Sequence, residues 1–364
     1  MKTILILSLS ITSLFFVNCS DDAQEYENIP DAKIALGKQI FFDKNLSNPM
    51  GQACASCHSP EKGFSDSSNQ DISIGANGTN FSNRNAPNLS YNVFAPSQFY
   101  NATDETYIGG FFYDGRSPNL QEQMIHPFIG SSEMNNGSID NVVIKIKNAI
   151  YYSEIQKIYG NQVSNSDIFS SVADAVTKFQ TSREVNSFTS KFDYVSKGLI
   201  QFTEDEKQGL ALFQGKGKCA QCHVLDADPN TGKVLFTDFS YDNLGIPRNN
   251  SNPFYNQTSN PVGNAYVDLG IGIIKNEPQH NGKFKVPSLR NSAISAPYYH
   301  NGSIATLKEA IHFYNVRDLN TGEFDPPEYN QNVNNTELGN LKLTEKEELQ
   351  IEQFINTLTD HYRK

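Results

Sequence analysis

Two short stretches of the sequence each place two thiols and an imidazole at a fixed spacing. They are Cys54, Cys57 and His58, and Cys219, Cys222 and His223. Two thiols separated by two residues can form thioethers with one edge of a porphyrin, and the adjacent imidazole then reaches the iron from one face. A redox-active dithiol or half of a zinc site would not need the histidine in both copies. The two stretches therefore predict two covalently bound haem c groups.

The remaining cysteine indicates export. Of the 5 Cys in 364 residues, haem attachment takes four, so no structural disulfide is expected. The apolar run Ile4–Val17 predicts a signal peptide over residues 1–18, which is too short for a lasting membrane span. Cys19 resembles the lipidated first residue of a bacterial lipoprotein, and the alternative is ordinary cleavage nearby that leaves a stray thiol. We expect a lipid-anchored protein of the periplasm or outer cell envelope, with residues 19–30 as a polar tether.

Composition limits the class of fold and of partner. The net charge is −11 at pH 7 and the sequence has no run of Lys or Arg, so it offers no basic face for nucleic acid. Asn, Ser, Gly and Pro are spread through long connections between helical patterns. We therefore expect an all-α fold of two cytochrome c-like haem domains with long ordered loops, over residues 31–198 and 199–364.

Helical periodicity and capping residues predict the elements that position the two motifs. The expected helices are Asp31–Phe42, Asn119–Met124, Asp140–Tyr152, Ser170–Phe179, one that begins after Thr203, one from Thr306 to about Asn315, and one within Leu343–Asp360. Thr203, Thr306 and Thr344 each stand three residues before a glutamate, which is the pattern of a capping box. The apolar side of the last helix is expected to carry Leu349, Phe354, Ile355 and Leu358. Ala35–Phe42 is similar to Gln208–Phe213, so the chain divides into two related halves.

Methionine is not available as a sixth ligand for the second iron. The four Met residues lie in the signal or the first half, at positions 1, 50, 124 and 134. The candidates after His223 are His280, His300, His312, His361 and several tyrosines. Helical phase places Tyr314 on one face with Leu307, Ala310 and Ile311, whereas His312 points the other way. Tyr314 is therefore either a core residue with a satisfied hydroxyl or the ligand itself.

The chain resembles the bacterial di-haem cytochrome c peroxidase and MauG family over nearly all of the mature sequence. Besides the two haem motifs, the matching segments are Arg84–Pro87, Phe112–Arg116, Leu120–Gln123, Ser132–Met134, Phe284–Asn291, Ala296–Gly302 and Ala305–Leu307. The resemblance implies a division of labour between the haems. The haem on His58 would be the peroxidatic one, and the haem on His223 would store or relay electrons.

The resemblance also implies distal residues at the peroxidatic haem. Gln123 and Glu133 fall on the family's distal-pocket positions. Cleavage of H₂O₂ needs a proton to move from one peroxide oxygen to the other, and a carboxylate can shuttle it while an amide positions the peroxide. Without the surrounding motifs, both residues would be read as ordinary exposed polar side chains.

Calcium and the remaining histidines are assigned by the same resemblance. Asn85 falls on a position that binds Ca²⁺ between the haems, together with backbone carbonyls that would here be those of Ser295 and Pro297. The alternative for Asn85 is an amide that caps a turn. His300 is expected to be structural or hydrogen-bonding. Exposed positions without chemistry are expected for His126, His280, His312 and His361.

Three departures from the family pattern are informative. Many members have a histidine that blocks the peroxidatic iron, but this chain has Asn77 near that place, so the site is predicted open in the ferric state. The interhaem tryptophan falls on Tyr113, and the sequence has no Trp at all. The axial methionine of the second haem falls on Tyr314, where MauG also has tyrosine. A phenolate ligand would lower the potential of that haem relative to methionine.

These residues together predict an enzyme that reduces H₂O₂ to water with electrons from a small redox protein such as a cytochrome c or a cupredoxin. One alternative is a MauG-like oxidase that uses H₂O₂ to oxidise a protein or an organic substrate. Another is a di-haem electron carrier without enzymatic activity. The resemblance also allows a homodimer, because peroxidases of this family are often dimers.

Overall fold

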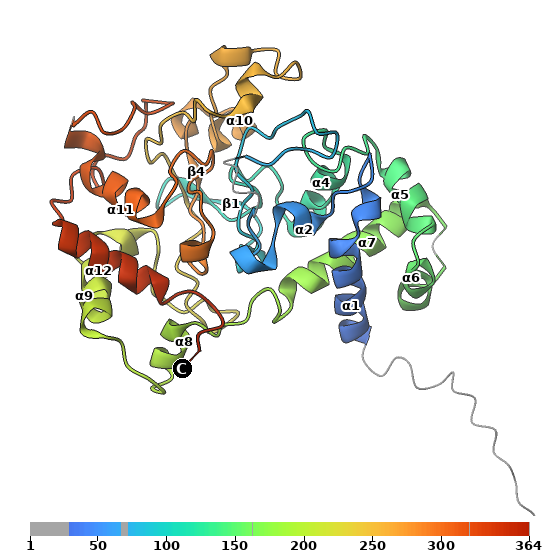
Figure 1. The fold of residues 1–364 in the computed structure, drawn as a ribbon, viewed down its shortest axis with the longest axis horizontal. Coiled ribbons are helices and arrows are strands. Elements are labelled where there is room, and N and C mark those ends of the chain that lie inside the picture. The colour runs from blue at the N-terminus through green and yellow to red at the C-terminus, as the bar shows by residue number, and fades with distance from the viewer. Residues whose placement is uncertain (1–28, 67–71, 162, 320, 364) are drawn as a thin grey trace, which may run out of the picture.

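The computed structural model describes residues 29–66, 72–161, 163–319 and 321–363. The helices of the first half are α1 (Ile29–Phe42), α2 (Cys54–Cys57), α3 (Leu120–Gln123), α4 (Ile125–Ile129), α5 (Ile139–Lys147), α6 (Tyr152–Tyr159) and α7 (Asn165–Thr181). α8 (Lys191–Ser196) ends the first half, and the helices of the second half are α9 (Glu204–Gln214), α10 (Ile271–Lys275), α11 (Leu307–Val316) and α12 (Glu345–Asn356). The two halves lie beside each other, joined through the segment after α7 (Figure 1).

The described chain is helix-rich with little sheet, so the all-α expectation holds only in this coarser form. Strands β1 (Phe99–Asn101) and β2 (Thr106–Ile108) pair antiparallel, and β3 (Tyr241–Asp242) pairs antiparallel with β4 (Phe284–Lys285). The second of these ribbons joins segments that are far apart in the sequence, and it lies between the two groups of helices (Figure 1). Long loops with short 3₁₀ turns make up much of the remainder.

One pair of crossing helices forms the core of each half. In the first half, Leu36 and Phe41 of α1 pack on α7, where the rings of Phe41 and Phe179 lie 5.1 Å apart. In the second half, Phe213 of α9 packs on Phe354 of α12, with ring centroids 5.2 Å apart. Burial of each such phenylalanine contributes about 1.5–3 kcal/mol to stability. The two cores therefore repeat one design, as the sequence similarity predicts.

A glycine lets the helices of each pair approach closely. A Cβ added to Gly37 would lie 1.9 Å from the carbonyl oxygen of Ala175 on α7. A Cβ added to Gly209 would likewise lie 1.9 Å from the carbonyl oxygen of Gln350 on α12. Because neither backbone oxygen can move without displacing its helix, both positions require glycine for this crossing.

Buried groups also connect the two halves. The hydrophobic cluster of the first half includes Leu235 and Phe239 from the second. Phe192 on α8 packs into the cluster of the second half. The guanidinium of the fully buried Arg290 donates two hydrogen bonds of 2.9 Å to Asp193 on the same helix α8. The expected domain boundary between residues 198 and 199 stays a prediction.

The predicted helix starts are confirmed for α9 and α12, where Thr203 and Thr344 form capping boxes. Thr306 caps α11 by accepting from the Glu309 N–H, without the reciprocal bond. These side chains satisfy backbone donors that no intrahelical carbonyl can reach, which is why the helices begin there.

Two details of the predicted helices were wrong. The segment Asp140–Tyr152 is not one helix, because the Asn148 amide donates to the Ile144 carbonyl and ends α5 before α6 begins. Leu349 is 47% exposed rather than on the apolar side of α12. It stands five residues before Phe354, which places it about 140° around the helix from that buried ring.

The N-terminal predictions lie outside the described residues. They are the signal peptide over residues 1–18 and the lipidated Cys19. Among the helices of the described part, none has both the length and the apolar character needed to cross a bilayer.

Replacing Gly209 by alanine should destabilise the second half, because the new methyl group would collide with the Gln350 carbonyl oxygen. We expect a loss of about 1–3 kcal/mol in the free energy of unfolding, measured by denaturant titration. Gln208→Ala, at the exposed neighbouring position, is the matched control and should stay within about 0.5 kcal/mol of the parent. Equal stability of Gly209→Ala and the parent would contradict the close crossing.

Candidate haem and peroxide sites

The first motif forms a single turn of helix that presents its histidine to one side. Cys54 and Cys57 are the ends of α2, and the His58 N–H donates to the Cys54 carbonyl at 3.0 Å. His58 Nδ1 lies 3.1 Å from the carbonyl oxygen of Phe64. Burial lowers the pKa of His58, which favours the neutral ring, and a proton placed on Nδ1 toward the Phe64 carbonyl would leave the lone pair on Nε2. That lone pair is what an iron needs.

The second motif repeats this arrangement with a 3₁₀ turn. The His223 N–H donates to the Cys219 carbonyl at 2.9 Å, and His223 Nδ1 lies 2.9 Å from the Phe236 carbonyl oxygen. Burial lowers the pKa of His223 to about 4. Phe236 and its counterpart Phe64 both have positive φ, 55° and 63°, which turns their carbonyls back toward the histidines.

The four motif thiols are free in the structure and partly buried. Burial raises the pKa of each of them to about 12.

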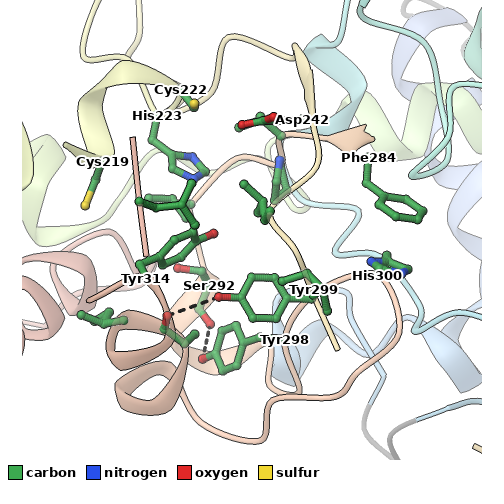
Figure 2. A pocket seen from close by; sticks show the side chains of 18 of the residues that line it. Cys219, Cys222, His223, Asp242, Phe284, Ser292, Tyr298, Tyr299, His300 and Tyr314 are labelled. Atoms are coloured by element: carbon green, nitrogen blue, oxygen red, sulfur yellow. Dashed lines mark hydrogen bonds between the residues drawn. The ribbon is translucent and has the colours of Figure 1, made fainter. Parts of the chain in front are cut away.

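A large, mostly apolar cavity opens beside the second motif. Cys219, Cys222 and His223 line one end, and Phe284 and His300 line the other (Figure 2). A flat apolar ring held by two thioethers and an imidazole fits these residues, so the second site suits haem c. Phe284 stacks on His300 with ring centroids 3.6 Å apart, and the buried His300 Nε2 has no partner among the described residues.

Tyr314 reaches the same cavity from α11, with its hydroxyl on the side of His223 (Figure 2). Burial raises the pKa of Tyr314, and a hydrogen bond from Tyr299 opposes that rise. The two phenol rings stand edge to face, 6.0 Å apart. Helical phase therefore predicted the inward direction of Tyr314 correctly. His312 points away, and its Nδ1 lies 2.9 Å from Glu348.

The exposed position expected for His280 was wrong. His280 is 2% exposed, because its ring packs against Tyr100 at 6.1 Å and Tyr107 at 5.3 Å, from the β1–β2 hairpin. His312 is half-buried rather than fully exposed, whereas His126 and His361 are exposed as expected.

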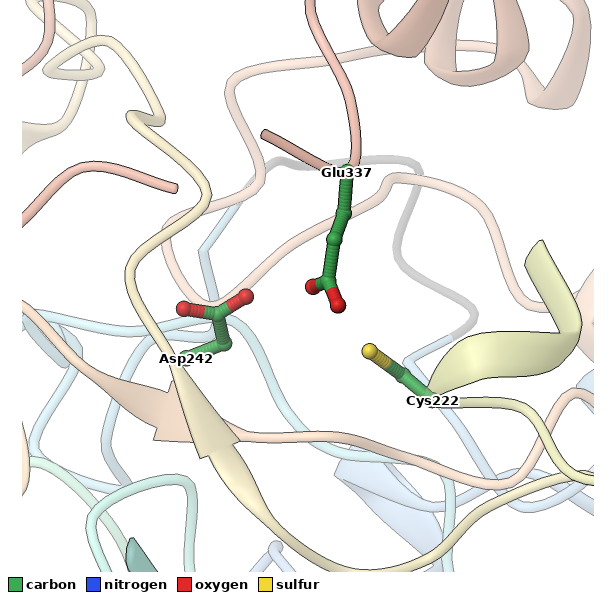
Figure 3. A group of neighbouring side chains, drawn as sticks. All are labelled: Cys222, Asp242 and Glu337. Carbon is green, nitrogen blue, oxygen red and sulfur yellow. The ribbon is translucent and has the colours of Figure 1, made fainter. Parts of the chain in front are cut away.

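Two carboxylates lie beside the sulphur of Cys222 in the second motif. The sulphur of Cys222 and the carboxylate oxygens of Asp242 and Glu337 lie within 4.8 Å of one another (Figure 3). The Asn334 amide donates to both carboxylates, at 2.6 Å and 2.5 Å. Both carboxylates line the cavity beside the second motif, so we call this group its acidic edge. Sequence reasoning missed both carboxylates, because no local pattern links residues so far apart.

Glu133 lies near the first motif, where its charge acts on Cys54 and Cys57. Burial raises the pKa of Glu133 to about 7, and the charge of Arg116 opposes the rise. Gln123 ends α3 and is half-buried. A carboxyl group with this pKa exchanges a proton readily near neutral pH.

The residues expected around calcium gather in the second cavity. Asn85, Ser295 and Pro297 line it, as does Tyr113, which is the residue expected between the haems. The Asn85 amide nitrogen donates to the Pro297 carbonyl at 2.8 Å, so a cation at this place would require the amide to turn its oxygen inward. The Tyr113 carbonyl accepts from the Lys285 N–H at 2.8 Å, which fixes the loop between the two motifs.

Two haem c attachment sites and a buried carboxyl near the first define a di-haem c-type oxidoreductase. Residues 31–201 match the family model described as di-haem cytochrome c peroxidase. Methylamine utilization protein MauG of Paracoccus denitrificans is 31% identical over 360 residues, covering 93% of this chain and 91% of its own. The chain belongs to the di-haem cytochrome c peroxidase family, which implies two c-type haems, and it is an oxidoreductase of the cytochrome-c peroxidase type.

Two further relatives extend the comparison. Cytochrome-c peroxidase IdrP2 of Denitromonas iodatirespirans is 30% identical, covering 85% of this chain and 82% of its own. The crystal structure of the diheme peroxidase BthA from Burkholderia thailandensis E264 superposes with a TM-score of 0.81 at 30% identity. It covers 90% of this chain and 86% of its own.

Removing one carboxylate from the acidic edge should raise the reduction potential of a haem held by His223, because the lost negative charge no longer stabilises the oxidised, more positive form. Glu337→Gln tests this in a spectroelectrochemical titration of the haem-loaded protein. Glu345→Gln, at the exposed start of α12, is the control and should leave the potential unchanged. A lower or unaltered potential in Glu337→Gln would contradict the assignment.

Proposed function

We propose that this protein is an exported peroxidase that reduces H₂O₂ to water, taking electrons from a small redox protein such as a cytochrome c or a cupredoxin. The observation that carries the proposal is the buried carboxyl group of Glu133, whose pKa of about 7 suits proton transfer at neutral pH. The family membership of the chain supports the reaction class.

The haem held by His58 would supply a redox-active iron that takes up peroxide. Glu133, as carboxylate, accepts the proton of one peroxide oxygen and gives it to the other, which leaves as water. Gln123 orients the peroxide through its amide. The overall reaction consumes two electrons and two protons per H₂O₂, and the electrons come from the donor protein.

The absence of a nearby histidine supports an iron that is open without prior reduction. The sequence has no histidine between His58 and His126. The segment that would carry a blocking histidine has Asn77 instead, whose amide oxygen accepts from the backbone N–H groups of Thr79 and Asn80. Asn77 is thus engaged in its own turn.

Tyr314 favours a second candidate function, a MauG-like oxidation of a protein or organic substrate by H₂O₂. A tyrosine ligand stabilises the oxidised form of an iron more than methionine does, so the second haem would hold an oxidising equivalent. Tyr113 then replaces tryptophan as the aromatic residue between the sites. An electron carrier without enzymatic activity would leave the buried Glu133 without a role.

The proposed enzyme is lipid-anchored outside the cytoplasm and binds calcium. Export and lipidation at Cys19 would hold the enzyme in the periplasm or at the outer cell envelope, where small electron carriers reach it. Calcium bound by Asn85 and the carbonyls of Ser295 and Pro297 would fasten the two halves between the haems. A homodimer is compatible with this arrangement.

The rate of the reaction with H₂O₂ should rise with pH through about 7, because Glu133 accepts a proton only as carboxylate. Stopped-flow mixing of the ferric, haem-loaded protein with H₂O₂ measures it. Glu133→Gln should slow the reaction by about a hundredfold or more and remove the pH dependence. Glu122→Gln, on the exposed face of α3, should behave as the parent. An unchanged rate of reaction with H₂O₂ in Glu133→Gln would contradict the proposed mechanism.

Tyr314→Met separates the two candidate functions. Mixing the ferric protein with one equivalent of H₂O₂, in the absence of donor, should give a long-lived oxidised state of the parent if the tyrosine ligand shares the oxidation. The variant should lose that state and show a higher potential at the second haem. His312→Gln, on the outer face of the same helix, is the control. No difference between the Tyr314→Met variant and the parent would exclude tyrosine ligation and the MauG-like function with it.

A further inference from the structure

An ion-pair network joins two of the family-like segments to the second half of the chain. Arg84 Nε and Nη2 donate to the two carboxylate oxygens of Asp268 at 2.7 Å and 2.8 Å. Its remaining nitrogen, Nη1, lies 2.7 Å from Asp114 Oδ2. Burial alone would raise the pKa of Asp268, but the Arg84 guanidinium lowers it to about 2. Arg84 therefore couples Asp114 of the first half to Asp268 of the second.

Asp114 in turn fixes the position of the Arg116 guanidinium. Arg116 Nη1 donates to both carboxylate oxygens of Asp114, at 2.9 Å and 3.0 Å. The guanidinium carbon lies 3.4 Å from the centre of the Phe112 ring, in a cation–π contact. Although the Arg116 side chain is 35% exposed, its charged end is held between a fixed carboxylate and a ring face.

The Phe112–Arg116 unit packs against the turn that carries Glu133. The edge of the Phe112 ring meets His126 at 5.3 Å and 88°. The Gly130 N–H donates to the His126 carbonyl at 2.8 Å, and the Glu133 N–H donates to the Gly130 carbonyl at 3.1 Å. A Cβ at Gly130 would come within 2.7 Å of Glu133 Oε2, so the carboxylate folds back over this turn. These contacts connect the segment that holds Arg116 to the turn that carries Glu133.

Within the described part of the chain, few charged groups act on Glu133. They are Arg116 and the sulphurs of Cys54 and Cys57, which carry no charge as thioethers. His126 faces Arg116 and is itself exposed. Arg116 is therefore the charge that can offset the burial of this carboxyl group.

We propose that Arg116 is a positioning residue of the peroxide site, which holds a positive charge beside Glu133 at a place fixed by Asp114 and Phe112. The inference rests on the proposed role of Glu133 as the proton shuttle. Its consequence is that a buried carboxyl group, which burial alone would keep protonated, stays able to ionise near neutral pH. Because Arg84 and Asp268 anchor Asp114, the charge is in place only when the two halves are docked.

An infrared pH titration of the ferric, haem-loaded protein tests the proposal without relying on turnover. The carbonyl band of protonated Glu133 is identified by its loss in Glu133→Gln. Arg116→Gln should move the titration midpoint of this band upward by about one pH unit, because the offsetting charge is gone. Arg116→Lys should recover part of that shift, since lysine keeps the charge but not the two-oxygen contact or the stacking.

Two further variants separate position from charge. Arg183→Gln removes one positive charge at an exposed place after α7 and should leave the midpoint unchanged. Phe112→Leu keeps every charge but removes the ring beneath the guanidinium, so it should shift the midpoint in the same direction as Arg116→Gln, by less.

Three results would overturn the proposal: an unshifted midpoint in Arg116→Gln, an equal shift in Arg183→Gln, or no shift in Phe112→Leu. Peroxide turnover that survives Glu133→Gln would instead count against the proposed function. That outcome would leave the effect of Arg116 on the Glu133 carboxyl group intact, so the two failures are distinguishable.

Discussion

A backbone carbonyl holds the histidine of each of the two motifs. The Nδ1 atoms of His58 and His223 are held by the carbonyls of Phe64 and Phe236, at 3.1 Å and 2.9 Å. This one hydrogen bond sets the tautomer, fixes the ring plane and leaves Nε2 free. It also explains the unusual positive φ of both phenylalanines, because a β-region backbone would aim the carbonyl elsewhere. Everything that the two sites do chemically depends on rings held in this way.

The two histidines are supported by similar pairs of crossing helices, but the side chains around them differ between the halves. Both halves place a glycine where two helices cross and an aromatic pair beside it. The first half adds a buried carboxyl group, Glu133, within reach of a positive charge. The second half adds a phenol, Tyr314, and an acidic edge at Asp242 and Glu337. Similar scaffolds thus carry different polar groups beside their motifs.

The sequence predicted most reliably what is local. The motif spacing, the caps Thr203 and Thr344, and the inward face of Tyr314 all follow from rules that span a few residues. The burial of His280 could not be predicted, because the rings that cover it belong to a hairpin far earlier in the chain. The orientation of the Asn85 amide could not be predicted either, because it depends on the Pro297 carbonyl of the other half. Long-range packing decides these features, and it has no signature in a single segment.

The sharing of buried side chains between the halves restricts how the chain can evolve. Leu235 and Phe239 complete the core of the first half, although they belong to the second. If the halves arose by duplication, each has since given up part of its own interior to the other. Neither could then be exchanged between proteins as an independent module, because its partner would lose core residues along with a haem. Such a chain evolves as one unit. A substitution where the two halves pack together then requires a matching substitution in the other half.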